Sequence, residues 1–401
     1  MRFFIMFLNC IVFIVNFTHA QNGYFCVPVT DLVAKPFVPT DHQSINALYN
    51  ELAISPQHGK SSCLRLHQGI FNEKVTILAY EHQQVQVELC NCFFQSMPAQ
   101  KLQRTRFWTR SDWVISEQEL TQLKISQAIF PPAIQYNDFC RNDFECVSLV
   151  VPWYDTNTDT TYSAGTRFVE IPPMSTEQEF AIRLYNHHTQ QATTSHVPRS
   201  VALTACFSTP HEQKQAFVEL LYIWCSLDGL IPFVWGGTSF NYMCKDEYAV
   251  LQEEYCHGKT SAFWHRPYII ERPYAGFDAS GFILRAAQIV GAPFFCINST
   301  TIGNYLRPLR KNESLEEGDI LWSPGYVGVV GSFKNNELIE MQGYARGYGK
   351  LHAIPLQKRF ANIYSWDDFL DYYWHSLSLQ SLDIEGNIVG LNAKYILFKF
   401  P

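Results

Sequence analysis

The chain has 401 residues, a formal net charge of −7 and an aromatic content of 15%. Its lysines and arginines are dispersed and form no basic stripe of the kind that a phosphate backbone requires, which argues against nucleic acid as a partner. The length favours two or three domains.

The first twenty residues have the pattern of an export signal. Arg2 supplies one positive charge, an apolar run continues to Val15, and the small residue Ala20 precedes polar residues. This pattern predicts a signal peptide over residues 1–20, cleaved after Ala20. A membrane anchor would need about 18 or more consecutive apolar residues, and Asn9 interrupts a shorter run. We therefore expect an exported protein, periplasmic or secreted, with no membrane span after cleavage.

Cysteine is frequent, with twelve in the chain and eleven after the signal segment, as is common in exported proteins. The spacing of Cys140 with Cys146, and of Cys244 with Cys256, fits local disulfides, and buried reduced thiols are the alternative. The pair in Cys90–Cys92 has no matching pair of ligands at zinc spacing. We expect neither a metal ion nor another cofactor.

Short strand patterns fill the segment from 21 to 125. Apolar and alternating runs occur at Lys74–Leu78, Val85–Leu89 and Phe107–Ile115. Strands of this length and spacing predict a small β-barrel.

A second β-rich segment runs from 126 to 200. The runs Val147–Tyr154 and Gly165–Val169 predict strands, with a polar turn at Asp155–Asp159 between them. The polar stretch His187–Ser195 is interpreted as a linker or exposed loop.

Helical periodicity begins in the segment from 201 to 401. The sequence Thr209–Glu212 predicts a capping box with proline at the first helical position, and the helix should stop at Gly229. A second helix is predicted from about Ser280 to Val290, ending at Gly291.

Strands return after the second helix. Asp319–Trp322, Tyr326–Gly331 and Glu337–Met341 predict strands, and the last two are joined across Asn335–Asn336. Helices followed by antiparallel strands indicate an α+β domain.

Four motifs then occur in order along this segment: Phe-Val-Trp-Gly-Gly at 233–237, Gly-Phe-Asp-Ala-Ser-Gly-Phe at 276–282, Glu-Gly-Asp-Ile at 317–320, and Gly-Tyr-Val-Gly-Val-Val at 325–330. Together they resemble the NlpC/p60 family of papain-like cell-wall cysteine peptidases. The resemblance implies an ancestry among enzymes that cleave γ-D-glutamyl bonds in peptidoglycan stem peptides.

Papain-like catalysis needs a cysteine at a helix N-terminus, a histidine on the adjoining sheet and a polar residue that orients the histidine. The resemblance places the nucleophile at Ala279, which has no nucleophilic atom, and the base at Tyr326, whose phenol titrates near pH 10. The orienting residue falls on Glu340, 14 positions after Tyr326. The nucleophile and the base are therefore expected to be lost.

Four more residues are candidate ligand-binding residues by the same resemblance. Asp278 and Ser280 match residues that help to bind the free amine of the substrate. The alternative is that Asp278 caps the helix and Ser280 lies in its first turn. Trp235 belongs to the first motif, and Phe233 stands where the family usually has tyrosine.

Two histidines outside these positions also require interpretation. Cys256 and His257 form the candidate pair for a displaced nucleophile and base, although neighbours on a strand point to opposite faces. His352 is expected to be a surface or groove residue of a late strand.

The resemblance also extends to the N-terminal segments, which are similar to the paired bacterial SH3-like domains of one subgroup. It implies a first SH3-like domain within 21–125, a second with a linker over 126–200, and a papain-like domain over 201–401 with an insertion around 238–275. The expected fold class is α+β, with two small β-barrels before the papain-like domain.

Three functions remain open from the sequence. The first is a pseudoenzyme that binds peptidoglycan stem peptides or a protein partner. The second is a cell-wall peptide hydrolase that uses non-standard residues, with Cys256 and His257 as its candidates. The third is a secreted structural or effector protein whose groove is filled by its own side chains, for which the large Tyr326 is a candidate.

Overall fold

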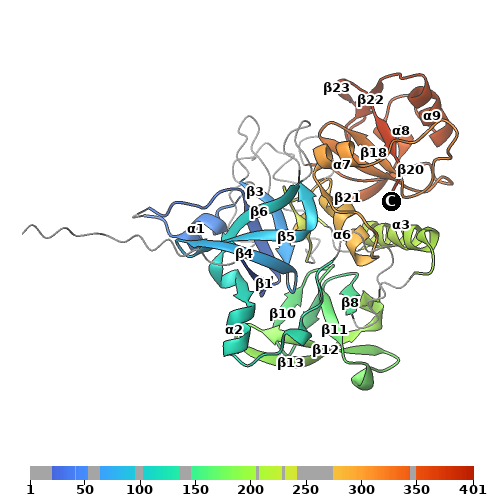
Figure 1. The fold of residues 1–401 in the computed structure, drawn as a ribbon. Coiled ribbons are helices and arrows are strands. Elements are labelled where there is room, and N and C mark those ends of the chain that lie inside the picture. Colours follow the sequence, from blue (N-terminus) through green and yellow to red (C-terminus); the bar gives the residue numbers. More distant parts are fainter. Residues whose placement is uncertain are drawn as a thin grey trace, which may run out of the picture.

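Three larger sheets, with helices between and beside them, make up the fold. The computed structural model of the protein describes residues 20–40, 42–52, 64–94, 103–134, 146–204, 207–227, 231–241, 274–343 and 349–401. Figure 1 has the sheets in chain order, coloured blue to cyan, green, and orange to red. The mixture of helix and sheet agrees with the predicted α+β class. No helix in the described ranges is long and apolar enough to cross a membrane, and the predicted signal peptide lies almost wholly outside them.

The first sheet has eight strands, in the order β3-β2-β6-β5-β4-β1-β7 with β17 beside β5. The path runs from β3 to β7, and the pairings of the described residues do not join its ends into the closed barrel that was expected. Its first seven strands are β1 (Gln21–Phe25), β2 (Val29–Val33), β3 (Arg65–Ile70), β4 (Lys74–Glu81), β5 (Gln84–Phe94), β6 (Gln103–Arg110) and β7 (Val114–Ser116), accompanied by helices α1 (Ile45–Asn50) and α2 (Glu117–Gln122).

The run Phe107–Ile115, interpreted as one strand region, is divided in the structure. Strand β6 ends at Arg110, and the short 3-10 helix Ser111–Trp113 turns the chain before β7. The turn sends β6 to pair with β5 and β7 to pair with β1. Trp113 is buried within this turn.

The second sheet has five strands in the order β13-β12-β11-β8-β14, with the hairpin β9–β10 beside it. The run Val147–Tyr154 forms two strands, because Pro152 lacks the N–H that an uninterrupted strand would use. The strands are β8 (Cys146–Leu149), β9 (Trp153–Asp155), β10 (Thr160–Tyr162), β11 (Arg167–Glu170), β12 (Glu179–Asn186), β13 (Gln191–Pro198) and β14 (Ala202–Leu203).

The interpretation of His187–Ser195 as a linker or exposed loop holds only for the turn at 187–190, and it was wrong for the rest. Strand β13 begins at Gln191 and pairs with β12 along its whole length, from Asn186 opposite Gln191 to Glu179 opposite Pro198. Most side chains of β13 are exposed or half-buried, and so its polarity reflects an edge strand that faces solvent.

The third sheet has the order β21-β20-β19-β18-β24. Figure 1 shows α3 and α6 between this sheet and the other two sheets. Helices α8 and α9 lie on the outer side of the third sheet. The elements are α3 (Pro210–Ser226), β15 (Thr238–Ser239), β16 (Gly276–Phe277), α6 (Gly281–Ile289), β17 (Cys296–Ile297), α7 (Ser299–Tyr305), β18 (Ile320–Ser323), β19 (Tyr326–Val330), β20 (Glu337–Met341), β21 (Leu351–Pro355), α8 (Leu356–Arg359), α9 (Trp366–Trp374), β22 (Leu379–Leu382), β23 (Ile388–Ala393) and β24 (Ile396–Phe398).

Both predicted helices of this segment exist. The Thr209 side chain accepts from Glu212 N, as predicted, but the Glu212 carboxylate accepts from Ser208 N and not from Thr209 N, so the capping box is only half formed. Helix α3 ends at Ser226, before the predicted stop. The predicted end of α6 is confirmed, since Gly291 has the positive φ of +72° that a helix-terminating glycine supplies.

Arg285 of α6 joins the helix to the first sheet. Its side chain is 2% exposed, and its Nη1 lies 2.6 Å from Glu73 Oε1, next to β4. Its Nε donates to the carbonyl oxygen of Thr238 at 2.8 Å, and its Nη1 also donates to Gln288 Oε1 at 2.9 Å. A buried guanidinium is stable only when its donors are used in this way.

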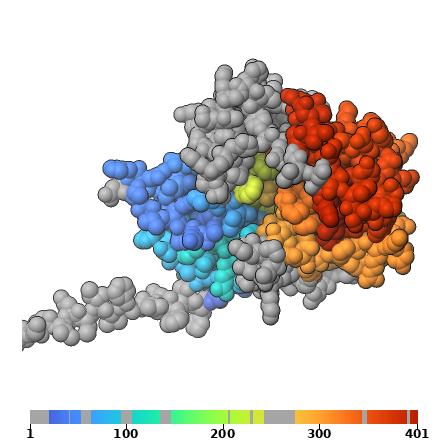
Figure 2. Space-filling view, turned by 90° about the horizontal axis from the view of Figure 1, so that it is seen from above, coloured from blue at the N-terminus to red at the C-terminus, as the bar shows by residue number. Residues whose placement is uncertain are grey.

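The second sheet touches the same side chain. A Cβ added to Gly165, whose φ is +86°, would lie 2.2 Å from Arg285 Cδ. Gln288 extends the contact to the first sheet by donating to the Asn91 carbonyl oxygen at 3.0 Å. Figure 2 agrees with this close packing, since the blue N-terminal residues lie against the orange C-terminal ones.

We predict that Arg285→Met lowers the free energy of unfolding by about 3 to 5 kcal/mol, because it leaves Glu73 buried without its cation. Urea unfolding monitored by tryptophan fluorescence measures the change. Arg106→Met is the control: its partner Glu88 is 3.4 Å away and the Arg106 side chain is 64% exposed, so its effect should stay below about 1 kcal/mol. Equal effects of the two substitutions would contradict the structural role of Arg285.

Candidate functional site

Helix α6 begins at Gly281, and Asp278, Ala279 and Ser280 directly precede it. Asp278 Oδ1 accepts hydrogen bonds from Ser280 N at 2.8 Å, from the Ser280 hydroxyl at 2.8 Å and from Gly281 N at 2.6 Å. Burial raises the pKa of Asp278, and these hydrogen bonds oppose the rise. The bonds show that Asp278 caps the helix, which is one of its two predicted roles. Its binding of a ligand stays a prediction.

Ser280 is held on both sides. Its hydroxyl donates to Asp278 and accepts from Asn298 N at 3.1 Å, and the residue is 3% exposed. Ala279, between the two, is partly exposed and presents only a methyl group at the helix N-terminus.

The Trp-Gly-Gly motif lies against this terminus. Asp278 N donates to the Gly237 carbonyl oxygen at 2.9 Å. A Cβ on Gly281 would lie 1.9 Å from that same oxygen, and one on Gly237 would lie 2.2 Å from the Gly276 carbonyl oxygen. These three glycines are therefore explained by close contact between backbones.

A buried polar cluster of the first sheet supports the loop from behind. Arg65 pairs with Asp31 through two bonds, Nε to Oδ1 at 2.6 Å and Nη2 to Oδ2 at 3.0 Å, and both side chains are buried. Arg65 also donates to the Trp235 carbonyl oxygen at 3.4 Å. Gln68 donates to Asp31 at 2.9 Å and accepts from the Ser239 hydroxyl at 2.8 Å. This cluster was not predicted from the sequence, because both Arg65 and Asp31 are distant in the chain from the Trp-Gly-Gly motif.

The two aromatic candidates of the motif differ in exposure. Trp235 is 43% exposed and so offers a surface to a ligand. Phe233 is 6% exposed and belongs to the main hydrophobic core, which leaves its ring little surface for a ligand.

Tyr326 and Glu340 meet on neighbouring strands. The Tyr326 hydroxyl donates to Glu340 Oε2 in a short hydrogen bond. Arg359 of α8 donates its Nε to the same oxygen at 2.9 Å, and its guanidinium lies 5.0 Å from the centre of the Tyr326 ring. Gln342 Nε2 donates to Glu340 Oε1 at 2.6 Å. The carboxylate that was predicted to orient a base is therefore shared among Tyr326, Arg359 and Gln342.

His352 belongs to the same cluster. It was expected at the surface or in a groove, but it is 9% exposed and its Nε2 lies 3.4 Å from Glu340 Oε1. That expectation was wrong, because β21 pairs with β20 and places His352 opposite Glu340.

Alternation along the strands gives the sheet two distinct faces. Val329 and its partner Ile339 belong to the core that contains α6, whereas Val330 and its partner Leu338 belong to the core beneath α9. The Tyr326 ring packs with this second core. The cluster around Glu340 thus fixes the C-terminal helices to the sheet.

The surroundings of Tyr326 and Glu340 shift the pKa values of both groups. Burial and then the Glu340 carboxylate raise the pKa of Tyr326 well above 10. Burial alone would raise the pKa of Glu340, but Arg359 and His352 lower it to about 2. At neutral pH Tyr326 is a protonated donor and Glu340 is an anion, so neither group is free to accept a proton from a nucleophile.

Several predicted residues lie outside the described ranges. These include Cys256, His257, Cys140 and Cys244, so the displaced pair and the two disulfides stay predictions. Among the described residues, no group of three or more histidine, cysteine or acidic side chains is arranged to hold a metal ion.

The fold has a counterpart among solved structures. An NlpC/P60 family protein from Bacillus cereus ATCC 10987 superposes with a TM-score of 0.51 and 13% sequence identity, over 84% of this chain and 94% of that one. The chain shares the NlpC/p60 fold. At this identity the likeness extends to the fold alone, and it covers the N-terminal sheets as well as the motif-bearing segment.

Two weaker matches carry no argument because of their low TM-scores. NlpC2 from Trichomonas vaginalis has a TM-score of 0.31 at 10% identity, covering 84% of this chain and 93% of that one. NlpC1 from the same organism has a TM-score of 0.30 at 8% identity, covering 86% of this chain and 90% of that one. No protein-family profile and no curated protein sequence matches the chain.

We predict that Glu340→Gln destabilises the protein by about 3 to 5 kcal/mol at pH 7, because Arg359 loses a buried anion. A carboxylate with a depressed pKa stabilises the fold above its unfolded pKa of about 4.5, and this stability is lost as the pH falls toward about 2. The difference in the free energy of unfolding between the parent protein and Glu340→Gln should therefore become smaller as the pH falls from 5 to 2. Urea unfolding across this range tests it, with Glu219→Gln on the exposed face of α3 as the control. A difference in unfolding free energy that does not change with pH would contradict the role of Glu340 as a stabilising anion.

Proposed function

We propose that this protein is an exported, catalytically inactive relative of the NlpC/p60 peptidases that binds peptidoglycan stem peptides. The observation that carries the proposal is the methyl group of Ala279 at the N-terminus of α6. Papain-type hydrolysis needs a thiolate at this point. The likeness in fold to the Bacillus cereus protein supports a cell-wall context for the chain.

The groups at the other two catalytic positions support inactivity independently. Tyr326 donates its proton to Glu340, and Glu340 is neutralised by Arg359. A general base must hold a free lone pair within reach of the proton that it removes. At neutral pH Tyr326 keeps its proton, and both oxygens of Glu340 already accept hydrogen bonds from Tyr326, Arg359 and Gln342.

What remains is suited to binding. Trp235 is exposed in the loop whose Gly237 carbonyl accepts from Asp278 N. Asp278 and Ala279 are partly exposed beside it. The proposal includes an SH3-like origin for the two N-terminal sheets, of which the first supports this loop through Arg65.

We predict that the purified mature protein leaves muropeptides and γ-D-glutamyl dipeptides intact, as measured by chromatography and mass spectrometry. Calorimetry should nevertheless detect binding of a stem tripeptide, and Trp235→Ala should weaken it about tenfold or more because an exposed aromatic contact is lost. Tyr364→Ala, which removes a 64% exposed aromatic residue elsewhere, is the control and should leave the affinity unchanged.

Three results would contradict the proposed function. Hydrolysis that Cys256→Ala abolishes would establish the hydrolase with non-standard residues. The absence of any stem-peptide binding would favour a protein partner or a structural role. Equal loss of binding in Trp235→Ala and Tyr364→Ala would place the peptide elsewhere.

We predict that Ala279→Cys creates a reactive thiol without creating an enzyme. The positive end of the α6 dipole should lower the thiol pKa below the free value of about 8.5. The variant thiol should react with iodoacetamide faster at pH 7 than the thiol of Thr189→Cys, a control in an exposed turn. Peptide mass spectrometry separates each from the native cysteines. Turnover of a muropeptide by Ala279→Cys alone would show that a base is present after all.

A further inference from the structure

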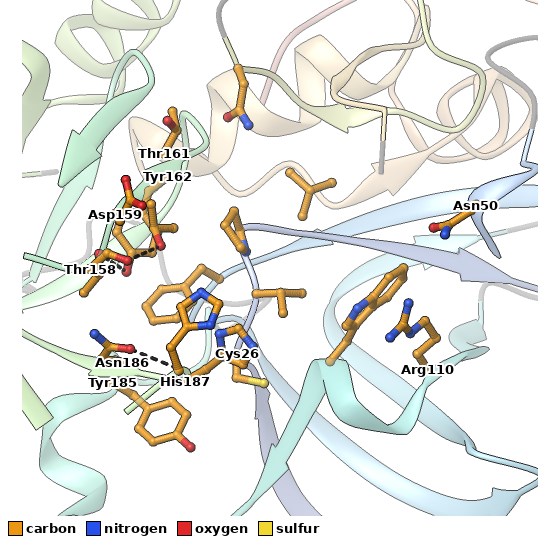
Figure 3. Close-up of a pocket in the computed structure, with 18 residues that line it drawn as sticks. Cys26, Asn50, Arg110, Thr158, Asp159, Thr161, Tyr162, Tyr185, Asn186 and His187 are labelled. Carbon is orange, nitrogen blue, oxygen red and sulfur yellow. Dashed lines mark hydrogen bonds between the residues drawn. The ribbon is translucent and has the colours of Figure 1, made fainter. Parts of the chain in front are cut away.

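A cavity of about 350 Å³ lies between the first and second sheets, away from Ala279. Figure 3 shows Thr158, Asp159 and Tyr162 of the β9–β10 hairpin on one side of the cavity. Asn50 and Arg110 lie on the opposite side of it. Cys26 and His187 lie between the two sides, and Asn241, which follows β15, completes the wall. The volume is near the lower end of the range of small-molecule sites, about 300 to 1,000 Å³.

The charged groups of this cavity already have partners. Arg110 Nε donates to Asp112 Oδ1 at 2.9 Å, and its guanidinium lies 4.7 Å from the centre of the Trp113 ring. Asp159 Oδ1 accepts from the Tyr154 hydroxyl at 2.6 Å. Arg110 is thus paired with an opposite charge, whereas the partner of the exposed Asp159 carboxylate is a neutral phenol. An acidic side chain at the rim disfavours an anionic ligand.

Its thiol and its imidazoles are not poised for chemistry. Burial raises the pKa of Cys26 to about 12, and its Sγ donates to the Asp112 carbonyl oxygen at 3.6 Å. Burial, and then His188, lower the pKa of His187, so that its ring is neutral at pH 7. The Cys26 thiol is thus buried and donates to a backbone carbonyl, and so it is not presented to the cavity as a nucleophile.

The remaining lining combines neutral polar groups with aromatic rings. Three asparagines and three threonines contribute amides and hydroxyls, and four aromatic side chains contribute apolar surface: Asn50, Asn186, Asn241, Thr158, Thr160, Thr161, Phe71, Trp113, Tyr162 and Tyr185. Among them, Asn241 Oδ1 is a buried oxygen with no hydrogen-bond partner in the described structure. An unused buried acceptor costs free energy unless a ligand or water donates to it.

We propose that this cavity binds an uncharged sugar, as a free mono- or disaccharide or as the end of a glycan chain. Hydroxyl groups of a sugar both donate and accept, which matches the amides and hydroxyls of the lining, and its apolar ring face matches the aromatic side chains. Asn241 Oδ1 accepts from one sugar hydroxyl or amide. The proposal does not rest on stem-peptide binding beside Ala279.

The test is calorimetric titration of the full mature protein with N,N′-diacetylchitobiose and with cellobiose, and with Ala-Ala as a zwitterionic comparator. At least one disaccharide should bind, and Ala-Ala should not. Asn241→Leu should weaken the binding about tenfold, the equivalent of one lost hydrogen bond. Thr161→Tyr should abolish it by filling the cavity, whereas Thr121→Tyr on the exposed surface of α2 should not.

Sedimentation with insoluble chitin and cellulose distinguishes binding of a free sugar from binding of the end of a glycan chain. Pelleting that Thr161→Tyr abolishes would show entry of a chain end, and binding of the disaccharide without pelleting would show a site for free sugars. The proposal is overturned if neither disaccharide binds at about 10 mM, or if Thr161→Tyr folds and binds like the parent protein. It is also overturned if Ala-Ala binds and Arg110→Gln removes that binding. None of these results alters the Trp235→Ala test, so the two proposals fail separately.

Discussion

The buried guanidinium of Arg285 is the contact on which the arrangement of the sheets depends. A guanidinium with 2% exposure is stable only because Glu73, the Thr238 carbonyl and Gln288 take up its donors. Glu73 directly precedes β4 of the first sheet, and Thr238 belongs to the motif-bearing segment. Gly165, in the turn before β11 of the second sheet, leaves room for the Arg285 side chain. One residue of α6 thereby fixes the helix against all of them, and the position of Ala279 at its N-terminus follows.

The backbone around position 279 is held in place by interactions that do not depend on the side chain there. The capping by Asp278 and the backbone contact between Gly237 and Gly281 hold a helix N-terminus in place. Neither interaction involves the side chain at position 279. Likewise the cluster around Glu340 stabilises the C-terminal helices through Arg359, whether or not position 326 carries a base. The N-terminus of α6 is therefore held by Asp278 and by the glycine contacts, and α8 is held to the sheet by the ion pair of Arg359 with Glu340.

Sequence periodicity predicted the elements whose packing is local and apolar. Helix α6 and the β19–β20 hairpin were found because their apolar residues recur at helical or strand spacing. Strand β13 was missed because an edge strand with exposed side chains has the composition of a loop. The pairs Arg285–Glu73 and Arg65–Asp31 join residues 212 and 34 positions apart. No short-range sequence pattern indicates such pairs, so the buried ion pairs that pack against the motif could not be predicted.

The same contacts bear on whether the cavity and the α6 terminus influence one another. Asn241 of the cavity follows β15, and β15 pairs with β16, which leads directly to Asp278. Coupling between two sites requires an element with two discrete arrangements between them. Here a Cβ at Gly237 or Gly276 would lie under 3 Å from neighbouring backbone atoms, so the strand pair is closely packed against its surroundings. We therefore expect a sugar held by Asn241 and a peptide beside Trp235 to bind with independent affinities, because the closely packed strand pair between them offers no second arrangement that either ligand would select.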